Sequence, residues 1–264
     1  MNTFTARAGL QWVKQGMQVF RKQPGALMAL FFCCMFLSMG VMIIPLVGQV
    51  APFVLTPLFT IALLEGCKHA DAGQRALPNL LLSGFRKPVR SPLLTLGALN
   101  FVMLLLAAAI LYALGGDTLN KIIAARPKQV APEQVEGIVG AVFAASGFYT
   151  LSWILTCLAA PLVYFQKLTV GKALFFSVVS VARGFKPFLV ATIMLHLLYF
   201  VGCQIVVLVF GGSPVAVAGV FTLFLLTIVL AHCTLYVAYR ELFPQPPAAA
   251  PVDLGKDDTP DPML

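Results

Sequence analysis

The side chains that could do chemistry in this sequence are few, and they lie in or beside long apolar runs. Asn100, His196, Gln204 and His232 interrupt these runs, and Glu65 stands near the end of one of them. Polar and ionisable groups at such positions mark functional sites in membrane proteins, because hydrocarbon solvates them poorly. These five side chains are therefore the first candidates for a site.

Cysteines at similar depth add a second set of candidate ligands. His196 follows Pro187 by nine residues and His232 precedes Arg240 by eight, which places both histidines roughly 12–14 Å from one membrane surface if both stretches are helical. Thiolate and imidazole ligands in one layer would suit a metal ion or a haem. The candidate ligands are His196, Cys203, His232 and Cys233, with Cys33, Cys34 and Cys157 in the same layer.

A simpler interpretation gives these residues no ligand. No Cys-x-x-Cys or His-x-x-x-His spacing occurs in the sequence. Each histidine would then make one hydrogen bond between helices, and the six cysteines would pack as small reduced apolar side chains. On this interpretation we expect no metal and no cofactor. We also expect no enzymatic activity, because the chain has no Gly-rich phosphate loop, no Ser/His/Asp set and no paired carboxylates within the apolar runs.

The composition is typical of a membrane protein. Hydrophobic residues make up 59% of the chain and charged residues 11%, whereas soluble proteins carry about 25% charged residues. The basic residues lie in the gaps between apolar runs, so the net charge of +8 indicates anionic inner-leaflet lipids as partners rather than nucleic acid. Six runs approach the roughly 20 residues that cross a bilayer: 25–45, 48–66, 92–114, 138–163, 187–210 and 214–238.

The distribution of lysine and arginine predicts the orientation. With a cytoplasmic N-terminus, fifteen basic residues fall on the cytoplasmic side and only Lys121, Arg126 and Lys128 on the other. Because cytoplasmic loops are enriched in such residues, we expect both termini in the cytoplasm and a multi-pass location in a bacterial inner membrane. The first run exceeds the about 7–15 residues of a signal-peptide core, so we expect it to remain as a helix.

A short motif of an aromatic residue, one or two basic residues and a proline precedes three of the runs. It reads Phe20-Arg21-Lys22-Gln23-Pro24, Gly84-Phe85-Arg86-Lys87-Pro88 and Gly184-Phe185-Lys186-Pro187. Three charged exits also recur, at Glu65-Gly66-Cys67-Lys68, Tyr164-Phe165-Gln166-Lys167 and Tyr239-Arg240-Glu241. The recurrence predicts parallel repeat units of about 4–68, 72–167 and 170–241.

These signals together predict an all-α membrane protein with six transmembrane helices arranged as three hairpins. Tight turns at residues 45–49 and 211–214 join the first and last pairs. Each hairpin is preceded by a short amphipathic interfacial elbow helix in this prediction. The transmembrane domain spans residues 1–243, and the proline-rich acidic segment 244–264 is expected to be a disordered cytoplasmic tail.

Three expectations concern packing. Residues 4–23 are predicted to lie in the interface, with the Trp12 ring at headgroup level. Small residues spaced as Gly137, Ala141 and Ala145 favour close helix contact and predict the fourth run at the centre of the bundle. Pro161 is expected to kink that run near its end.

The elbows and hairpins resemble uncharacterised multi-pass inner-membrane families of proteobacteria. They are also similar to the membrane domain found with some bacterial glycerophosphodiester phosphodiesterases. The likeness covers residues 8–241 and depends on Trp12, the Phe20-Arg21-Lys22 elbow, Pro45 with Gly48, and the two Gly-Phe-basic-Pro elbows. The resemblance implies location and architecture only, because the catalytic residues of those phosphodiesterases belong to a separate soluble barrel.

The sparse polar interior favours a structural or interaction protein that organises lipid or a membrane-protein partner. The alternative is a permease or channel for a small solute, which would need a cavity near Pro57, Asn100 and His196. A second alternative is a metal or haem carrier built on the candidate ligands above. The sequence names no reaction for any of them.

Overall fold

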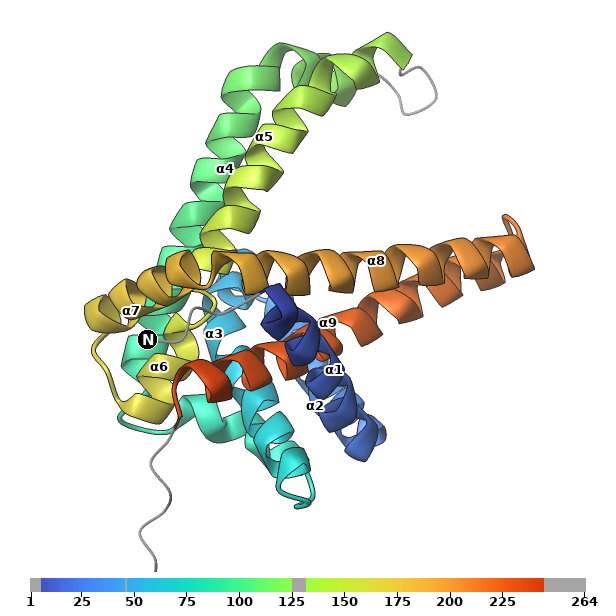
Figure 1. Cartoon of the computed structure of the whole chain (residues 1–264). Helices are drawn as coiled ribbons and strands as arrows, with labels where there is room; N and C mark the ends of the chain where they lie inside the picture. The colour runs from blue at the N-terminus through green and yellow to red at the C-terminus, as the bar shows by residue number, and fades with distance from the viewer. Residues whose placement is uncertain (1–5, 46, 125–131, 245–264) are drawn as a thin grey trace, which may run out of the picture.

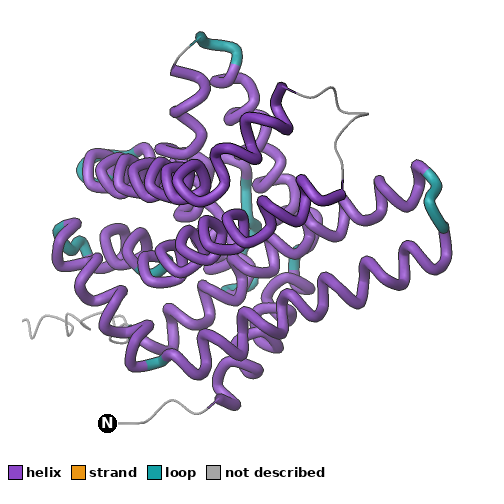
Figure 2. Tube along the Cα trace, turned by 90° about the horizontal axis from the view of Figure 1, so that it is seen from above, coloured by secondary structure: helices purple, strands orange, loops and turns teal. Residues whose placement is uncertain are grey.

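The computed structural model describes residues 6–45, 47–124 and 132–244, and in these ranges the chain is helical, without strands. Figure 1 labels the helices, and Figure 2 shows from above the short loops that join many of them. The elements are α1 (Ala6–Lys22), α2 (Pro24–Met42), α3 (Val47–Asp71), the 3₁₀ helix η1 (Pro78–Phe85), α4 (Arg90–Ala124), α5 (Pro132–Thr156), α6 (Ala159–Gln166), α7 (Val170–Arg183), α8 (Phe185–Phe210) and α9 (Pro214–Leu242).

Six of these stretches are long and apolar enough to cross a membrane. They are Pro24–Met42, Val47–Asp71, Arg90–Lys121, Ile138–Gln166, Phe185–Phe210 and Pro214–Leu242. The all-helical class with six candidate membrane-spanning helices, predicted from the apolar runs, is therefore confirmed. The predicted tail lies outside the described residues, apart from Pro244.

Local sequence explains where several of these helices begin and end. Pro24 and Pro214 occupy first-turn positions of α2 and α9, where a missing N–H costs nothing. The Ser213 hydroxyl accepts a hydrogen bond from the Ala216 N–H and caps α9. Gly211 ends α8 with a φ of 61°, a backbone conformation that glycine adopts without strain.

Consecutive long helices pack against each other: α2 with α3, α4 with α5, and α8 with α9. In Figure 1, the α4–α5 pair and the α8–α9 pair extend in different directions from a shared region that contains α1, α3, α6 and α7. The buried core lies mainly in this shared region. The far parts of the pairs carry exposed apolar side chains, such as Ile43, Phe143 and Leu208, the last 86% exposed. Such surface suits contact with lipid tails.

Helix α1 is packed into the protein, so the Trp12 ring, which was expected among lipid headgroups, is instead surrounded by protein side chains. The Trp12 side chain is 0% exposed, and α1 lies against α8 and α9. Glycines on its buried face allow backbone contact: a Cβ on Gly9 would collide with the Pro187 carbonyl, and one on Gly16 would lie 2.8 Å from the Thr234 Oγ1. An amphipathic pattern does not distinguish a lipid surface from a protein surface, so the sequence could not place this face.

Helix α5, the first part of the fourth predicted run, is not at the centre of the bundle, which corrects a second expectation for that part. It packs mainly against α4, and nothing lies within 4 Å of a Cβ built on Gly140 or Gly147. Ala141 serves the contact with α4, where a Cβ on Gly115 would lie 2.9 Å from the Ala141 Cβ. Small residues permit one close helix contact but do not require several.

The fourth predicted run is divided into α5 and α6 around Cys157 and Leu158. The break precedes Pro161, whose ring and missing N–H disrupt the preceding helical turn. Ser177 of α7 fills the gap: its hydroxyl donates to the Leu155 carbonyl at 2.7 Å and accepts from the Leu158 N–H at 3.2 Å. A buried side chain thus satisfies backbone groups that the break leaves open.

Replacing Ser177 with alanine is expected to lower the free energy of unfolding by about 1–3 kcal/mol, because two buried backbone groups lose their partner. Ser177 is 0% exposed, so water does not readily replace the lost hydroxyl as a partner of these backbone groups. The measurement is denaturant unfolding of the purified protein in detergent. Ser146, whose exposed hydroxyl bonds only within α5, provides the matched alanine control. Equal stability of the two variants would contradict the role given to Ser177.

Candidate functional site

The three charged exits, far apart in the sequence, meet where α3, α6 and α9 end. The Phe165 ring of α6 stacks on the Tyr239 ring of α9 at 5.3 Å between centroids. Lys68 of α3 places its ammonium 5.2 Å from the Phe165 ring centroid, within the range of a cation–π contact. Tyr239 stacks in turn on Phe243 at 5.6 Å. We call α1 and these three helix ends the helix-end cluster.

A cavity of about 320 Å³ opens in the helix-end cluster. Its walls are mostly aromatic, and its cationic groups are the ammonium of Lys68 and the guanidinium of Arg240. No acidic side chain is among the described residues that line it, which are Lys68, Phe165, Tyr236, Tyr239, Arg240, Phe243 and Pro244. The volume is within the range of small-molecule sites, about 300–1,000 Å³.

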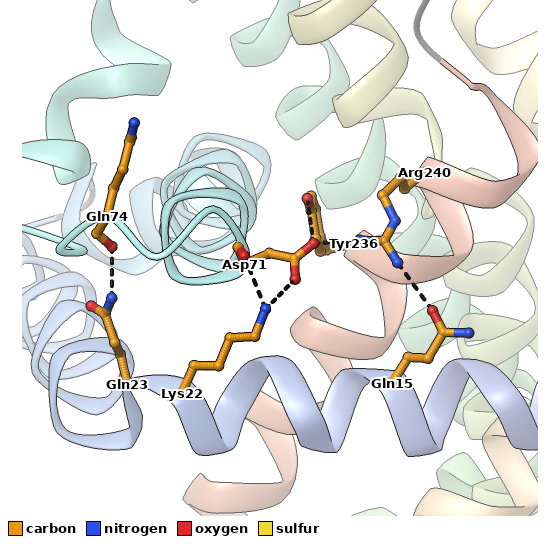
Figure 3. Close-up of polar contacts among 7 residues, drawn as sticks. All are labelled: Gln15, Lys22, Gln23, Asp71, Gln74, Tyr236 and Arg240. Atoms are coloured by element: carbon orange, nitrogen blue, oxygen red, sulfur yellow. Dashed lines mark hydrogen bonds and ion pairs between the residues drawn. The ribbon is translucent and has the colours of Figure 1, made fainter. Parts of the chain in front are cut away.

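Asp71 joins three elements beside this cavity (Figure 3). Its Oδ1 accepts from the Lys22 Nζ of α1 at 2.7 Å, and its Oδ2 accepts from the Arg240 Nη1 of α9 and from the Tyr236 hydroxyl at 3.4 Å. Arg240 also donates from Nη2 to the Gln15 Oε1 at 3.0 Å. These contacts hold the guanidinium in one position.

The energy of the Asp71 ion pairs is modest. The Lys22, Asp71 and Arg240 side chains are 46%, 21% and 47% exposed, and solvent screening limits such pairs to about 1 kcal/mol or less. Their effect is to orient the cations. Gln23 adds a second link, donating to the Gln74 carbonyl at 2.6 Å and accepting from the Ala76 N–H at 3.0 Å.

Trp12 of α1 contacts both the end of α9 and the start of α8. Its indole Nε1 donates to the Glu241 carboxylate at 2.7 Å. Its ring meets Phe188 edge to face at 5.1 Å between centroids. Glu241 is next to Arg240 in α9, so the bond from Trp12 and the bond to Gln15 join α1 to the same turn of α9.

The candidate metal ligands predicted from the sequence are not brought together. His196 lines a cavity beside α8 and α9, whereas His232 faces a different cavity beside α2 and α3. Cys233 lies against Cys67, with 3.2 Å between the sulfur atoms, and Cys203 lines neither cavity. Among the described residues, no group of three His, Cys, Asp or Glu side chains is arranged to hold a metal ion.

Each histidine bonds within its own helix, which corrects the expectation of bonds between helices. The Nδ1 atoms of His196 and His232 lie 2.8 Å from the carbonyls of Thr192 and Ile228, four residues earlier. A helix can satisfy one polar atom of such a side chain locally. One nitrogen of each imidazole is therefore satisfied within its own helix.

The three residues suggested for a transport path do not line one cavity. Pro57 and Asn100 border a space of about 30 Å³, close to the volume of one water molecule. His196 borders a separate cavity of about 270 Å³, together with Trp153, Thr192 and Tyr199. The space that Pro57 and Asn100 share is therefore small.

Sequence reasoning missed Asp71, Gln15 and Tyr236. A usable signal existed for Asp71, because it is an acidic residue just after the exit at Lys68, in a segment rich in basic residues. No local signal identified Gln15 or Tyr236, whose partners lie more than 160 positions away.

Comparison with known proteins gives one informative match. No family model matches the sequence, and no solved structure matches it. A protein of Burkholderia thailandensis described as a probable inner membrane protein is 30% identical over 249 residues, covering 90% of this chain and 92% of the relative. The chain belongs to the family of that protein. It is thus a multi-pass inner-membrane protein, in agreement with its six membrane-length helices. The comparisons give no support to the resemblance to phosphodiesterase-associated membrane domains.

Proposed function

We propose that this inner-membrane protein acts without catalysis and organises anionic lipid of the cytoplasmic leaflet around its helix-end cluster. The observation that carries the proposal is the convergence of three helix ends and α1 into one packed, cationic and aromatic unit. Aromatic and basic side chains at the ends of membrane helices are suited to the headgroup region. Helix ends joined by contacts of this kind support a scaffold rather than a passage.

The proposed arrangement is three helix pairs, each preceded by a short element that lies against the inner leaflet. The elements before α2, α4 and α8 are α1, η1 and α7. The excess of fifteen basic residues over three supports a cytoplasmic position for both termini and for the helix-end cluster. In this orientation, the exposed apolar parts of α4, α5, α8 and α9 extend into the bilayer.

The small space beside Pro57 and Asn100 supports the scaffold over the permease. A solute path through Pro57 and Asn100 needs room, and the space there is about 30 Å³. Membrane transporters that couple to ions or protons also carry ionisable side chains at mid-membrane. In α3 and α4, the described side chains around this space are threonines, Asn100 and apolar residues.

Quenching of tryptophan fluorescence by brominated lipids tests the proposed lipid organisation. Full-length protein is reconstituted in vesicles that contain brominated phosphatidylglycerol or brominated phosphatidylcholine at equal mole fraction. Trp153 is 43% exposed and so reports on lipid next to the protein. We expect stronger quenching by the anionic lipid, because enrichment around the cations raises its local fraction. Equal quenching by the two lipids would contradict the proposal.

The permease alternative retains one observation in its favour, the cavity of about 270 Å³ beside His196. Release of small uncharged solutes from the same reconstituted vesicles is its test. Release faster than from protein-free vesicles, and slowed by filling the cavity with His196→Trp, would favour this alternative.

A further inference from the structure

The cavity in the helix-end cluster has an unbalanced positive charge. Arg240 is neutralised by Asp71, which also pairs with Lys22. Lys68 has no carboxylate within 4 Å among the described residues, and its ammonium instead lies over the Phe165 ring. An ammonium in this setting has donors available for an anion, since it carries three N–H groups.

Arg240 also has donors available for an anion in this cavity, and its guanidinium is already held in place. Its contacts with Asp71 and Gln15 engage one N–H on each of its two Nη atoms, and a guanidinium has five donors in a fixed plane. Side chains that are held in place before binding lose less conformational entropy when the ligand arrives. The two cations, one fixed and one unpaired, both line the cavity.

The position of the cavity matches the boundary of a bilayer. Lys68 lies three residues before the end of α3 at Asp71, Arg240 lies two residues before the end of α9 at Leu242, and Phe165 lies one residue before the end of α6. All three helices belong to candidate membrane spans. Basic pockets between membrane helices on the cytoplasmic side are suited to phospholipid headgroups.

The aromatic walls distinguish a lipid from a free anion. Phe165, Tyr236, Tyr239 and Phe243 surround the cations with rings, and such surface gains from covering the glycerol and the first methylene groups of a lipid. An inorganic anion would leave this apolar wall in contact with water. The chemistry of the cavity is therefore that of an amphiphile with a negative headgroup.

We propose that this cavity binds the phosphate headgroup of an anionic phospholipid, with Lys68 and Arg240 as its cationic ligands and the rings of Phe165, Tyr239 and Phe243 against its glycerol end. The inference rests on the proposed lipid-organising function and assigns it a site.

The test uses full-length protein in detergent and short-chain lipids below their micelle concentration. The rise of the unfolding temperature on titration with dihexanoyl phosphatidylglycerol gives its Kd, and dihexanoyl phosphatidylcholine and inorganic phosphate are titrated alongside. We expect saturable stabilisation by the anionic lipid, with much weaker effects of the other two. Lys68→Gln is expected to raise the Kd roughly tenfold or more, because a charge-assisted contact is lost.

Lys167→Gln is the matched control. Lys167 makes the same kind of cation–π contact, with its ammonium 5.0 Å from the Tyr164 ring centroid, but it does not line the cavity. Its Kd should equal that of the unsubstituted protein. Lys68→Arg keeps the charge and should retain most of the affinity. Each variant's unfolding temperature without lipid shows that it has folded.

Three results would overturn the site. They are an unchanged Kd in Lys68→Gln, an equal effect of Lys167→Gln, or inorganic phosphate binding as well as the lipid. If the site fails while brominated phosphatidylglycerol still quenches preferentially, lipid organisation stands without this cavity. If preferential quenching is also absent, both proposals fail.

Discussion

Replacing Trp12 with alanine is expected to lower the free energy of unfolding by about 3–5 kcal/mol, the range for removing a large buried aromatic side chain. The ring is 0% exposed and meets Phe188 edge to face. Its indole N–H also donates to Glu241, so the substitution leaves a carboxylate without that donor. The measurement is denaturant unfolding of the purified protein in detergent.

Trp153→Ala is the control for this prediction, since it removes the same side chain from α5, where it is 43% exposed. We expect a clearly smaller loss of stability there. A second variant, Trp12→Phe, separates packing from hydrogen bonding, because it keeps an aromatic ring and removes the donor to Glu241. Should Trp12→Ala unfold no more easily than Trp153→Ala, α1 is not docked as described.

Gly16→Val is expected to destabilise the protein by about 3 kcal/mol, near the upper end for overpacking. A Cβ at this position would lie 2.9 Å from the Thr234 backbone nitrogen and 3.0 Å from its Cα. Backbone atoms of α9 cannot move aside as a flexible side chain can. The helix α1 must therefore shift away from α9, and thermal unfolding in detergent measures the loss.

Gly140→Val provides the matched control, because nothing lies within 4 Å of a Cβ at Gly140 in α5. Both substitutions place the same β-branched residue in a helix, so the difference between them isolates the contact with α9. Equal losses in the two variants would show that helix propensity, and not packing, determines the result.

Both predictions bear on the proposed lipid site as well as on stability. Helix α1 supplies Gln15, which holds Arg240, and Lys22, which holds Asp71. If α1 moves, the guanidinium loses the contacts that fix it beside the cavity. The affinity for dihexanoyl phosphatidylglycerol should therefore fall in Gly16→Val even at temperatures where the rest of the protein stays folded.

The sequence by itself determined the six membrane-length helices and several of their ends. Apolar runs of sufficient length must form helices in a bilayer, since no other partner satisfies their backbone groups. Proline positions such as Pro24, Pro161 and Pro214 act within one turn of the chain, so they too can be predicted locally. The excess of basic residues on one side predicts the orientation by the same local reasoning.

Only the tertiary structure decided which faces of these helices meet. Trp12 and Glu241 are 229 positions apart, and Asp71 and Arg240 are 169 apart, so no local pattern connects them. The same limit explains why His196 and His232, predicted to lie at the same depth, do not form one site in the structure. Equal depth along two helices does not fix the rotation of either, and the rotation depends on close contacts such as that between Gly16 and Thr234.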